Sequence, residues 1–206
     1  MGASVSFAFG FSKAFNLSAK KQHIVAIIGD STFFHTGLPA LIDAVHNKAA
    51  FLLVILDNST VAMTGNQKTL SSSTDSLGYN AKSISIEKII QSLGVSFLEV
   101  IDPYDYKKSI ETLIASKHYI DQNKDIAVII FRHLCVNTEE GLKNNPVLKV
   151  FVDDNCKGCK ICIDEFECQS LIFNEQTQKV EIDRKTCIDC AQCIYACPFN
   201  CIGALK

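Results

Sequence analysis

The spacing of apolar residues in the first 133 residues predicts helices alternating with strands. Short, continuously apolar runs of Ile, Val and Leu indicate strands that are buried on both faces, as in a parallel sheet. Such runs lie at 23–28 and 51–56, and further strands are expected at 96–101 and 126–131. Longer segments with helical spacing lie at 3–16, 37–49, 86–93 and 104–120. The alternation predicts a doubly wound, mostly parallel α/β domain over residues 1–133.

Two segments of this domain add detail. Residues 3–16 are mostly small and apolar, which predicts a buried helix that packs closely through Gly10. The stretch from Gly65 to Asn80 is polar, has few apolar residues and is expected to be a long loop. Long loops in compact domains tend to be functional or mobile.

Residues 134–146 are a predicted linker, in which Asn144, Asn145 and Pro146 disfavour regular secondary structure. A different sequence pattern follows this linker. The segment Val150-Phe-Val-Asp153 precedes one group of cysteines, and Val180-Glu-Ile-Asp183 precedes another. A short strand is expected before each group. This internal repeat predicts one small α+β module at 147–206.

Eight of the ten cysteines fall into two runs in this module. The second run, Cys187-x2-Cys190-x2-Cys193-x3-Cys197-Pro198, has the spacing of bacterial ferredoxins. The first run is Cys156-x2-Cys159-x2-Cys162, with five residues between Cys162 and Cys168 and no proline after Cys168. In ferredoxins with two clusters, the fourth cysteine of each run binds the other cluster. The expected ligands are therefore Cys156, Cys159, Cys162 and Cys197 for one [4Fe–4S] cluster, and Cys187, Cys190, Cys193 and Cys168 for the second.

Structural zinc and disulfide bonds are the alternatives. Zinc sites usually pair C-x2-C knuckles rather than use C-x2-C-x2-C triplets. Disulfides need an oxidising compartment, and the sequence shows no secretory signal. The two cysteines outside the ligand sets, Cys135 and Cys201, are expected to be small buried apolar residues.

Charge and hydropathy narrow the class of protein further. The net charge is −2 and there is no basic run, which argues against a nucleic-acid partner. No apolar stretch reaches the roughly 18–20 residues that span a membrane. A cytoplasmic protein is expected.

A second candidate site follows the first two predicted strands. Asp30 comes directly after the first strand and Asn58 after the second. The carboxyl ends of parallel strands meet at one edge, where ligands bind. A carboxylate and an amide oxygen suit Mg²⁺ with a diphosphate, and a helix opening near Gly37 could direct its N–H groups at the same anion. The alternative, in which Asp30 caps a helix and Asn58 caps a turn, stays open on these residues alone.

Longer stretches resemble a known family. Gly29-Asp30-Ser31, 26 further residues and then Asn58 are similar to the thiamine-diphosphate motif, with serine in place of its third glycine. The strings GDSTFFHTG (29–37), LDNSTVAMTGNQ (56–67) and MGASVSFAFG (1–10), with the two-cluster module, resemble the α subunits of indolepyruvate ferredoxin oxidoreductases. Gln169 departs from the proline of that family, which affects only local packing.

The resemblance implies roles for individual residues. The side chains of Asp30 and Asn58 and the backbone carbonyl of Thr60 would bind Mg²⁺. His35 would lie near the reacting carbon as a proton donor or substrate contact, although a lone histidine is more often structural. Other residues matching the cofactor-binding segments are Gly29, Ser31, Met63, Thr64, Gly65 and Gln67.

The implied activity is oxidative decarboxylation of a 2-oxoacid to an acyl-CoA, with electrons passing through two [4Fe–4S] clusters to an external ferredoxin. Indolepyruvate or another arylpyruvate is the favoured substrate, with pyruvate and 2-oxoglutarate as alternatives. The α subunits of the family begin with a pyrimidine-binding domain, and this chain is expected to correspond to their C-terminal part, as a truncated product or as one piece of a split enzyme. A separate pyrimidine-binding domain or subunit, a β- or γ-type subunit, ferredoxin and coenzyme A are the implied partners. The competing hypothesis is a non-catalytic electron carrier with a degenerate thiamine domain.

Overall fold

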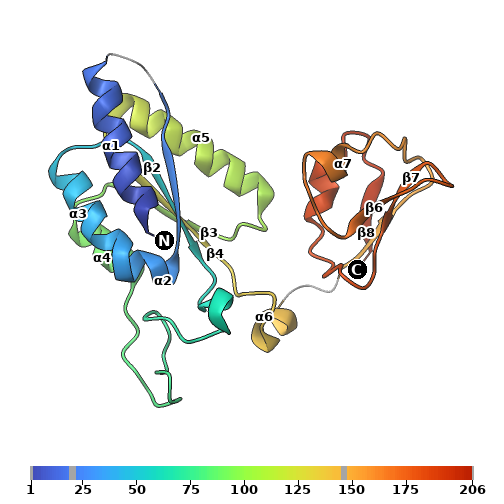
Figure 1. Ribbon diagram of the computed structural model, residues 1–206, viewed down its shortest axis with the longest axis horizontal. Helices are drawn as coiled ribbons and strands as arrows, with labels where there is room; N and C mark the ends of the chain where they lie inside the picture. The colour runs from blue at the N-terminus through green and yellow to red at the C-terminus, as the bar shows by residue number, and fades with distance from the viewer. Residues whose placement is uncertain (1, 19–21, 145–147, 206) are drawn as a thin grey trace. The chain divides into compact units, whose positions relative to one another are not determined.

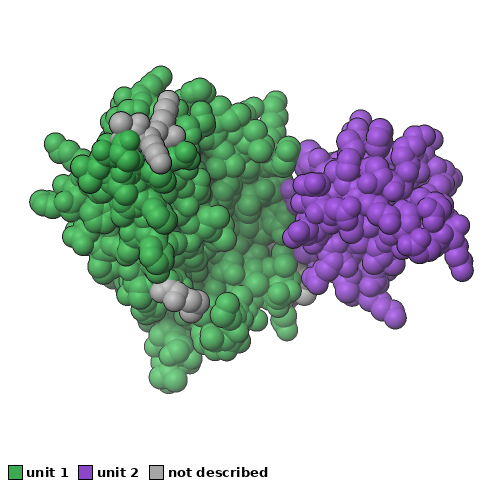
Figure 2. Space-filling model, turned by 45° about the horizontal axis from the view of Figure 1, so that its top comes forward, with its two compact units in different colours: residues 1–142 green, residues 143–206 purple. Residues whose placement is uncertain are grey.

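The computed structural model describes residues 2–18, 22–144 and 148–205. The chain divides into two compact units, residues 1–142 and 143–206 (Figure 2). Within the predicted linker at 134–146, Glu139–Asn144 forms the short helix α6, which the Thr138 hydroxyl caps by accepting a hydrogen bond from the Gly141 N–H at 3.1 Å. Asn145 and Pro146 of the predicted interruption lie outside the described residues.

The first unit is built on a four-stranded, fully parallel sheet, so the predicted α/β class is confirmed. Its strands lie in the order β1 (Val25–Gly29), β2 (Leu52–Asp57), β4 (Ala127–Arg132) and β3 (Phe97–Ile101). Helices cover both faces (Figure 1): α5 (Tyr106–Asn123) covers one, while α1 (Ala3–Leu17), α3 (Leu38–His46) and α4 (Ile86–Ser92) cover the other.

Continuous apolar runs in the two central strands supply both layers of the core. Because side chains alternate along a strand, Leu53 and Ile55 pack with residues of α1, α3 and α4. Their neighbours Leu52 and Val54 pack with residues of α5 instead. The same alternation runs along β4, whose Ala127–Ile130 segment is fully buried.

The prediction that the first strand is buried on both faces was wrong. In β1, Ala26 and Ile28 are buried, but Val25 is 55% exposed and Ile27 is 57% exposed. β1 lies at the edge of the sheet, and α5 packs against β2, β3 and β4 instead. An apolar run therefore identified the strand but not its place in the sheet.

Two expectations about helices also need correction. The helix expected to open near Gly37 begins at Asp30, where α2 (Asp30–Thr32) runs through the π-helical η1 (Phe33–Gly37) into α3. Gly37 allows close packing instead, because a Cβ there would lie 2.6 Å from Ile28 Cδ1. Gly10 is exposed, and a Cβ on it would meet nothing within 4 Å, so α1 does not pack through this residue.

The second unit contains two antiparallel strand pairs. β5 (Lys149–Val152) pairs with β8 (Ile202–Leu205), and β6 (Leu171–Asn174) pairs with β7 (Lys179–Ile182). The predicted strand before each cysteine run is confirmed as β5 and β7. The short helices α7 (Ile161–Asp164) and η3 (Gln192–Ala196) lie within the runs. Among the described residues, none of the helices has the length and apolar character needed to cross a membrane.

Candidate functional site

The carboxyl ends of β1 and β2 lie side by side, with Gly29 opposite Leu56 in the strand register. Asp30 and Asn58, which follow these residues, consequently line one cavity of about 450 Å³. Thr60 lines the same cavity. The edge of the sheet thus brings together the three residues for which the sequence suggested a shared cation site.

Asp30 contributes a buried carboxylate to the lining of this cavity. Its side chain is buried, and Oδ1 accepts a hydrogen bond from the Ser31 N–H at 2.7 Å. Oδ2 is buried and has no hydrogen-bond partner among the described residues. Burial, and next the negative charge of nearby Asp57, raise the pKa of Asp30 to about 6. Because an unpaired buried carboxylate is costly, this oxygen fits a bound cation.

The alternative, that both side chains cap local structure, does not hold for Asp30 but does hold for Asn58. Asp30 lies inside α2, whose N-cap is Gly29 and which has no side-chain cap. Asn58 does stabilise a turn, because its Oδ1 accepts a hydrogen bond from the Thr60 N–H at 3.2 Å. An amide oxygen has two lone pairs, so this bond is compatible with a cation on the second. Ser59 between them has a left-handed backbone, with φ of 59°.

The loop after β2 forms another wall. Met63 and Thr64 of η2 (Ala62–Thr64) line the cavity. Gln67 supports the loop: its side chain bonds both the hydroxyl and the carbonyl of Thr64 at 2.6 Å, and its own carbonyl accepts from the Thr60 hydroxyl at 3.1 Å. Gly65 supplies a left-handed turn with φ of 114°. Gly65 and Gln67 therefore shape this loop, while Met63 and Thr64 face the cavity.

The remaining predicted residues of this site divide in the same way. Gly29 and Ser31 line the cavity at the junction of β1 and α2. His35 lies on η1, is exposed, and is absent from the cavity lining among the described residues. The structure therefore offers no contact that supports its suggested catalytic role.

Sequence reasoning missed several polar residues at this edge. Asp57 lines the cavity and receives the Arg132 Nε–H on Oδ2 at 2.7 Å, while the second arm of Arg132 reaches Glu87 at 2.6 Å. His133 also lines the cavity, with its Nδ1 3.1 Å from an oxygen of Asp102. Arg132 ends β4 and His133 directly follows it, so the strand-end rule applied to this strand would have indicated both.

The second predicted ligand set meets at a small cavity in the second unit. Cys187, Cys190, Cys193 and Cys168 all line this cavity of about 40 Å³. Burial, and next the charges of the other three cysteines, raise the pKa of Cys193 to about 12. Four mutually close thiols in an apolar pocket favour deprotonation only when a metal compensates their charge.

The first set has the same character. Burial raises the pKa of Cys162 to about 11, and the charges of Cys197, Cys159 and Cys156 add to it in that order. Cys197 follows Cys162 by 35 residues, and the two thiols lie near one another only because the repeat folds back on itself. Backbone N–H groups point at several sulfurs: Val180 at Cys156 (3.5 Å), Cys201 at Cys197 (3.3 Å) and Asp189 at Cys187 (3.4 Å). Such N–H···S bonds are typical around cluster thiolates.

The two cysteine runs also have the same backbone conformation at equivalent positions. Gly158 and Asp189 occupy equivalent positions and have φ of 62° and 54°; Lys160 and Ala191 are equivalent, with φ of 62° and 61°. These left-handed residues turn each loop around its thiolates. At Gly158 a Cβ would collide with the carbonyl of Gln178, so the turn requires glycine there.

The alternatives for the cysteines find no support in this geometry. All ten are free, which leaves no disulfide. No group of three or more His, Cys, Asp or Glu side chains among the described residues is arranged to hold a single metal ion. A cubane binds its thiolates through four different iron atoms and does not need that tight arrangement. Of the two remaining cysteines, Cys201 is buried as expected and Cys135 is half-buried.

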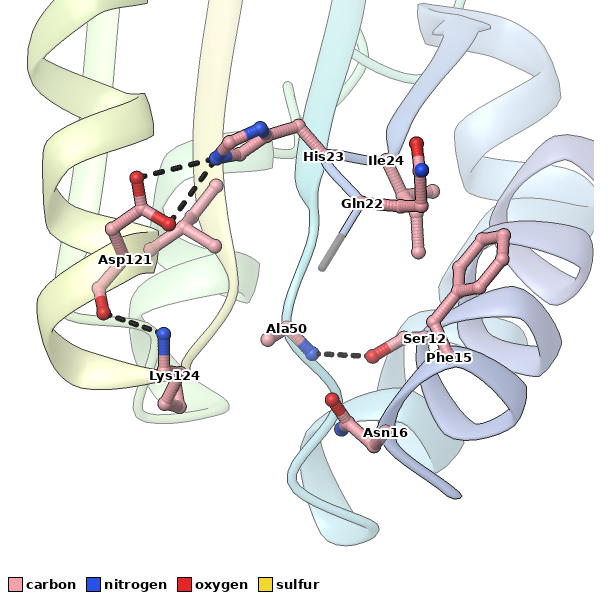
Figure 3. Close-up of a pocket in the computed structure, with 10 residues that line it drawn as sticks. Ser12, Phe15, Asn16, Gln22, His23, Ile24, Ala50, Asp121 and Lys124 are labelled. Atoms are coloured by element: carbon pink, nitrogen blue, oxygen red, sulfur yellow. Dashed lines mark hydrogen bonds and ion pairs between the residues drawn. The ribbon is translucent and has the colours of Figure 1, made fainter. Parts of the chain in front are cut away.

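A further pocket lies at the opposite end of the sheet, where Ile24 and Ala50 precede β1 and β2 (Figure 3). It measures about 240 Å³ and is bordered by the His23–Asp121 pair (3.2 Å) and by Ser12, whose hydroxyl accepts from the Ala50 N–H at 2.9 Å. Ligands of parallel α/β sheets bind at the other, carboxyl edge. These polar groups are already paired with one another, so we assign this pocket no function.

Comparison with known proteins agrees with this geometry. The family described as "Thiamine pyrophosphate enzyme, C-terminal TPP binding domain" matches residues 1–130. Over its whole length, the chain is 36% identical to the indolepyruvate oxidoreductase subunit IorA of Thermococcus kodakarensis and 40% identical to that of Methanothermobacter marburgensis. The chain spans only about a third of these relatives, 33% and 31% respectively. The predicted resemblance is thereby confirmed.

A solved structure supports the fold. The 2-oxoglutarate:ferredoxin oxidoreductase of Magnetococcus marinus superposes with a TM-score of 0.53 at 13% identity. The alignment covers 70% of this chain and 50% of that one. At this identity, the likeness concerns the fold alone.

Proposed function

Because this chain belongs to the thiamine pyrophosphate enzymes, through their C-terminal cofactor-binding domain, we propose that it is the diphosphate-binding and electron-transfer portion of a 2-oxoacid:ferredoxin oxidoreductase. Indolepyruvate or another arylpyruvate is the proposed substrate, since the relatives that match the whole chain are named for indolepyruvate. The proposed products are an acyl-CoA and reduced ferredoxin.

The observation on which this proposal chiefly depends is the pairing of the Asp30–Asn58 cavity with two four-cysteine groups in one chain. The buried Oδ2 of Asp30, the Oδ1 of Asn58 and the Thr60 carbonyl would hold Mg²⁺ with the diphosphate. Gly29, Ser31, Met63 and Thr64 would enclose the cofactor. When bound, thiamine diphosphate supplies the carbon–carbon bond cleavage that side chains alone do not provide.

In the second unit, the two cysteine sets would each hold a [4Fe–4S] cluster, which transfers one electron at a time. Oxidative decarboxylation releases two electrons, so two clusters suit the stoichiometry. The N–H groups of Val180, Cys201 and Asp189 would stabilise the thiolate charge. A pyrimidine-binding domain or subunit, a β- or γ-type subunit, external ferredoxin and coenzyme A complete the proposed system.

A pair of variants tests the two sites separately. In anaerobically purified protein, Asp30→Ala should abolish binding of Mg²⁺–thiamine diphosphate in calorimetry and leave the brown cluster absorption unchanged. Cys190→Ala should reduce iron content and absorption but keep diphosphate binding. If either variant loses both properties, the assignment of separate sites to the two units is wrong.

The electron-carrier hypothesis is tested with the same protein. Binding of Mg²⁺–thiamine diphosphate is measured with the chain alone and with a separately expressed pyrimidine-binding domain. Failure in both conditions would replace the enzyme proposal with a non-catalytic electron carrier. A colourless protein that contains zinc would overturn the cluster proposal.

A further inference from the structure

Arg132 bridges the carboxylates of Asp57 and Glu87, and Asp57 directly precedes Asn58 in the chain. It is the last residue of β4 and lies opposite Asp57 in the β2–β4 register. Its Nε–H donates to Asp57 Oδ2 at 2.7 Å, and its Nη1 donates to Glu87 Oε1 at 2.6 Å. The Asp57 side chain is only 2% exposed. The rigid guanidinium fork therefore fixes the position of a buried carboxylate.

Asp57 in turn holds the neighbouring turn. Its Oδ1 accepts a hydrogen bond from the Ser59 N–H at 3.1 Å, within the segment that includes the left-handed Ser59. The end of β4 adds two backbone bonds, from His133 N–H to the Asp57 carbonyl (3.1 Å) and from Cys135 N–H to the Asn58 carbonyl (3.2 Å). The Asp57 side chain and the end of β4 therefore hold the same turn, which carries Asn58 and Thr60.

Asp57 is also a potential competitor for the cation. It lines the same cavity as Asp30 and lies near enough for its charge to act on that carboxyl. Magnesium that binds phosphates usually uses one or two carboxylates. A second free carboxylate would strengthen binding of a bare cation, yet it would repel the diphosphate that must share the site.

We propose that Arg132 is a positioning residue that keeps Asp57 out of the ligand set of the cation and uses it to hold the Asn58–Thr60 turn. The inference rests on the proposed function, because it assigns the partners of the same magnesium–diphosphate site. Glu87 has the supporting role of orienting the guanidinium from its far side. With Asp57 held away, the site is suited to a cation that arrives with a diphosphate rather than to a bare ion.

The Arg132→Gln variant of the full chain tests this with two ligands. Binding of Mn²⁺ alone is measured by electron paramagnetic resonance, and binding of Mg²⁺–thiamine diphosphate is measured by calorimetry. Changes in the residues that surround a metal site usually alter metal affinity 10–100-fold. We expect Mn²⁺ alone to bind about tenfold more tightly and Mg²⁺–thiamine diphosphate to bind at least about tenfold more weakly. General damage to the site would weaken both.

Two further variants serve as controls. Adding Asp57→Asn to Arg132→Gln removes the released carboxylate, so Mn²⁺ affinity should return to about the wild-type value. Arg184→Gln removes the other arginine of the chain, which forms a comparable bridge to Asp189 at 2.9 Å in the second unit. It should change neither cation affinity in the first unit.

Arg132→Lys keeps the experiment decisive if Arg132→Gln does not fold. A single ammonium cannot reproduce the two-armed geometry, so smaller shifts in the same two opposite directions are expected, about threefold. Parallel weakening of both ligands, or no change in either, in a folded variant would overturn the proposal. Failure of the wild-type chain to bind Mg²⁺–thiamine diphosphate would count against the proposed function instead, and the Mn²⁺ measurements would still report on Arg132.

Discussion

The two units of this chain use buried groups in opposite ways. In the first unit the buried apolar clusters contain none of the polar residues of the site, which lie at one edge of the sheet. In the second unit the candidate ligands Cys162 and Cys193 are themselves core residues, packed with Val150, Leu171 and Val180. Folding of the first unit should therefore be independent of the proposed cofactor, whereas folding of the second should depend on the proposed clusters.

Removal of iron should have the largest effect on folding. The contrast between the two units would be wrong if both of them unfolded. A module as small as residues 143–206 has little apolar surface to bury, and metal-binding energy acts as folding energy in such domains. We expect removal of the clusters to unfold the second unit and leave the first folded. Because the chain has no tryptophan, amide hydrogen exchange resolved by unit is the suitable measurement.

The control for this experiment is removal of divalent cations without loss of iron, which should leave exchange in both units unchanged. Protection that persists in the second unit without iron would show that its apolar residues suffice. Loss of protection in both units would show that they fold together.

The Asp30→Asn variant sharpens the comparison by measuring how much the buried carboxylate of Asp30 lowers the free energy of unfolding of the first unit. The pKa of Asp30 is raised to about 6, mainly by burial. A raised carboxyl pKa contributes stability below the unfolded value near 4, and this contribution is lost as the pH rises through 6. Without divalent cations, Asp30→Asn should thus be more stable than the wild type by about 2–3 kcal/mol at pH 7.5.

The measurement is the free energy of unfolding of the first unit at several pH values, from hydrogen exchange. The advantage of Asp30→Asn should shrink toward zero as the pH falls from 7 to 4. An advantage that does not change with pH would mean that the carboxylate is not destabilised by its surroundings.

Glu87→Gln tests the ion pair between Glu87 and Arg132, which is expected to have a moderate effect on stability. The hydrogen bond from Arg132 holds the pKa of Glu87 at about 2. A lowered carboxyl pKa contributes stability above about pH 4.5, which is lost as the pH falls toward 2. At pH 7 the variant should be less stable by about 1–2 kcal/mol, because a charge-assisted bond is replaced by a neutral one.

Equilibrium unfolding at pH 7 and at pH 3 measures this difference, which should be smaller at the lower pH. Lys117→Gln, which removes an exposed ion pair of 3.6 Å on α5, is the control and should cost less than about 1 kcal/mol. Equal costs for the two variants would contradict a special role for the Arg132 bridge.

Gly10→Ala should have the smallest effect and the opposite sign. A Cβ at Gly10 meets nothing within 4 Å, and alanine favours the interior of a helix over glycine. We expect the first unit to gain about 0.5–1 kcal/mol, measured by its unfolding midpoint. A loss of stability would revive the original expectation that α1 packs through this residue.

Much of the structure followed from local sequence patterns. The strands around 51–56 and 126–131 were identified because short, continuous runs of Ile, Val and Leu are typical of buried strands. The strand around 96–101 was identified although Glu99 interrupts its apolar residues. The cysteine spacing predicted which thiols come together, and Cys168 lies with Cys187, Cys190 and Cys193 around one cavity. The positions of Asp30 and Asn58 after their strands were enough to place them at one edge of a parallel sheet.

Strand order and long-range pairing depended on the tertiary structure. The apolar run of β1 could not show that this strand lies at the edge, because exposure is set by which helix covers it. The bridge from Arg132 to Asp57 joins residues 75 positions apart that become neighbours only through the β2–β4 register. The sequence determined the elements and the candidate ligands, because these depend on neighbouring residues. The fold decided that Asp57 is held by arginine while an Asp30 oxygen has no hydrogen-bond partner among the described residues, because that depends on contacts between distant strands.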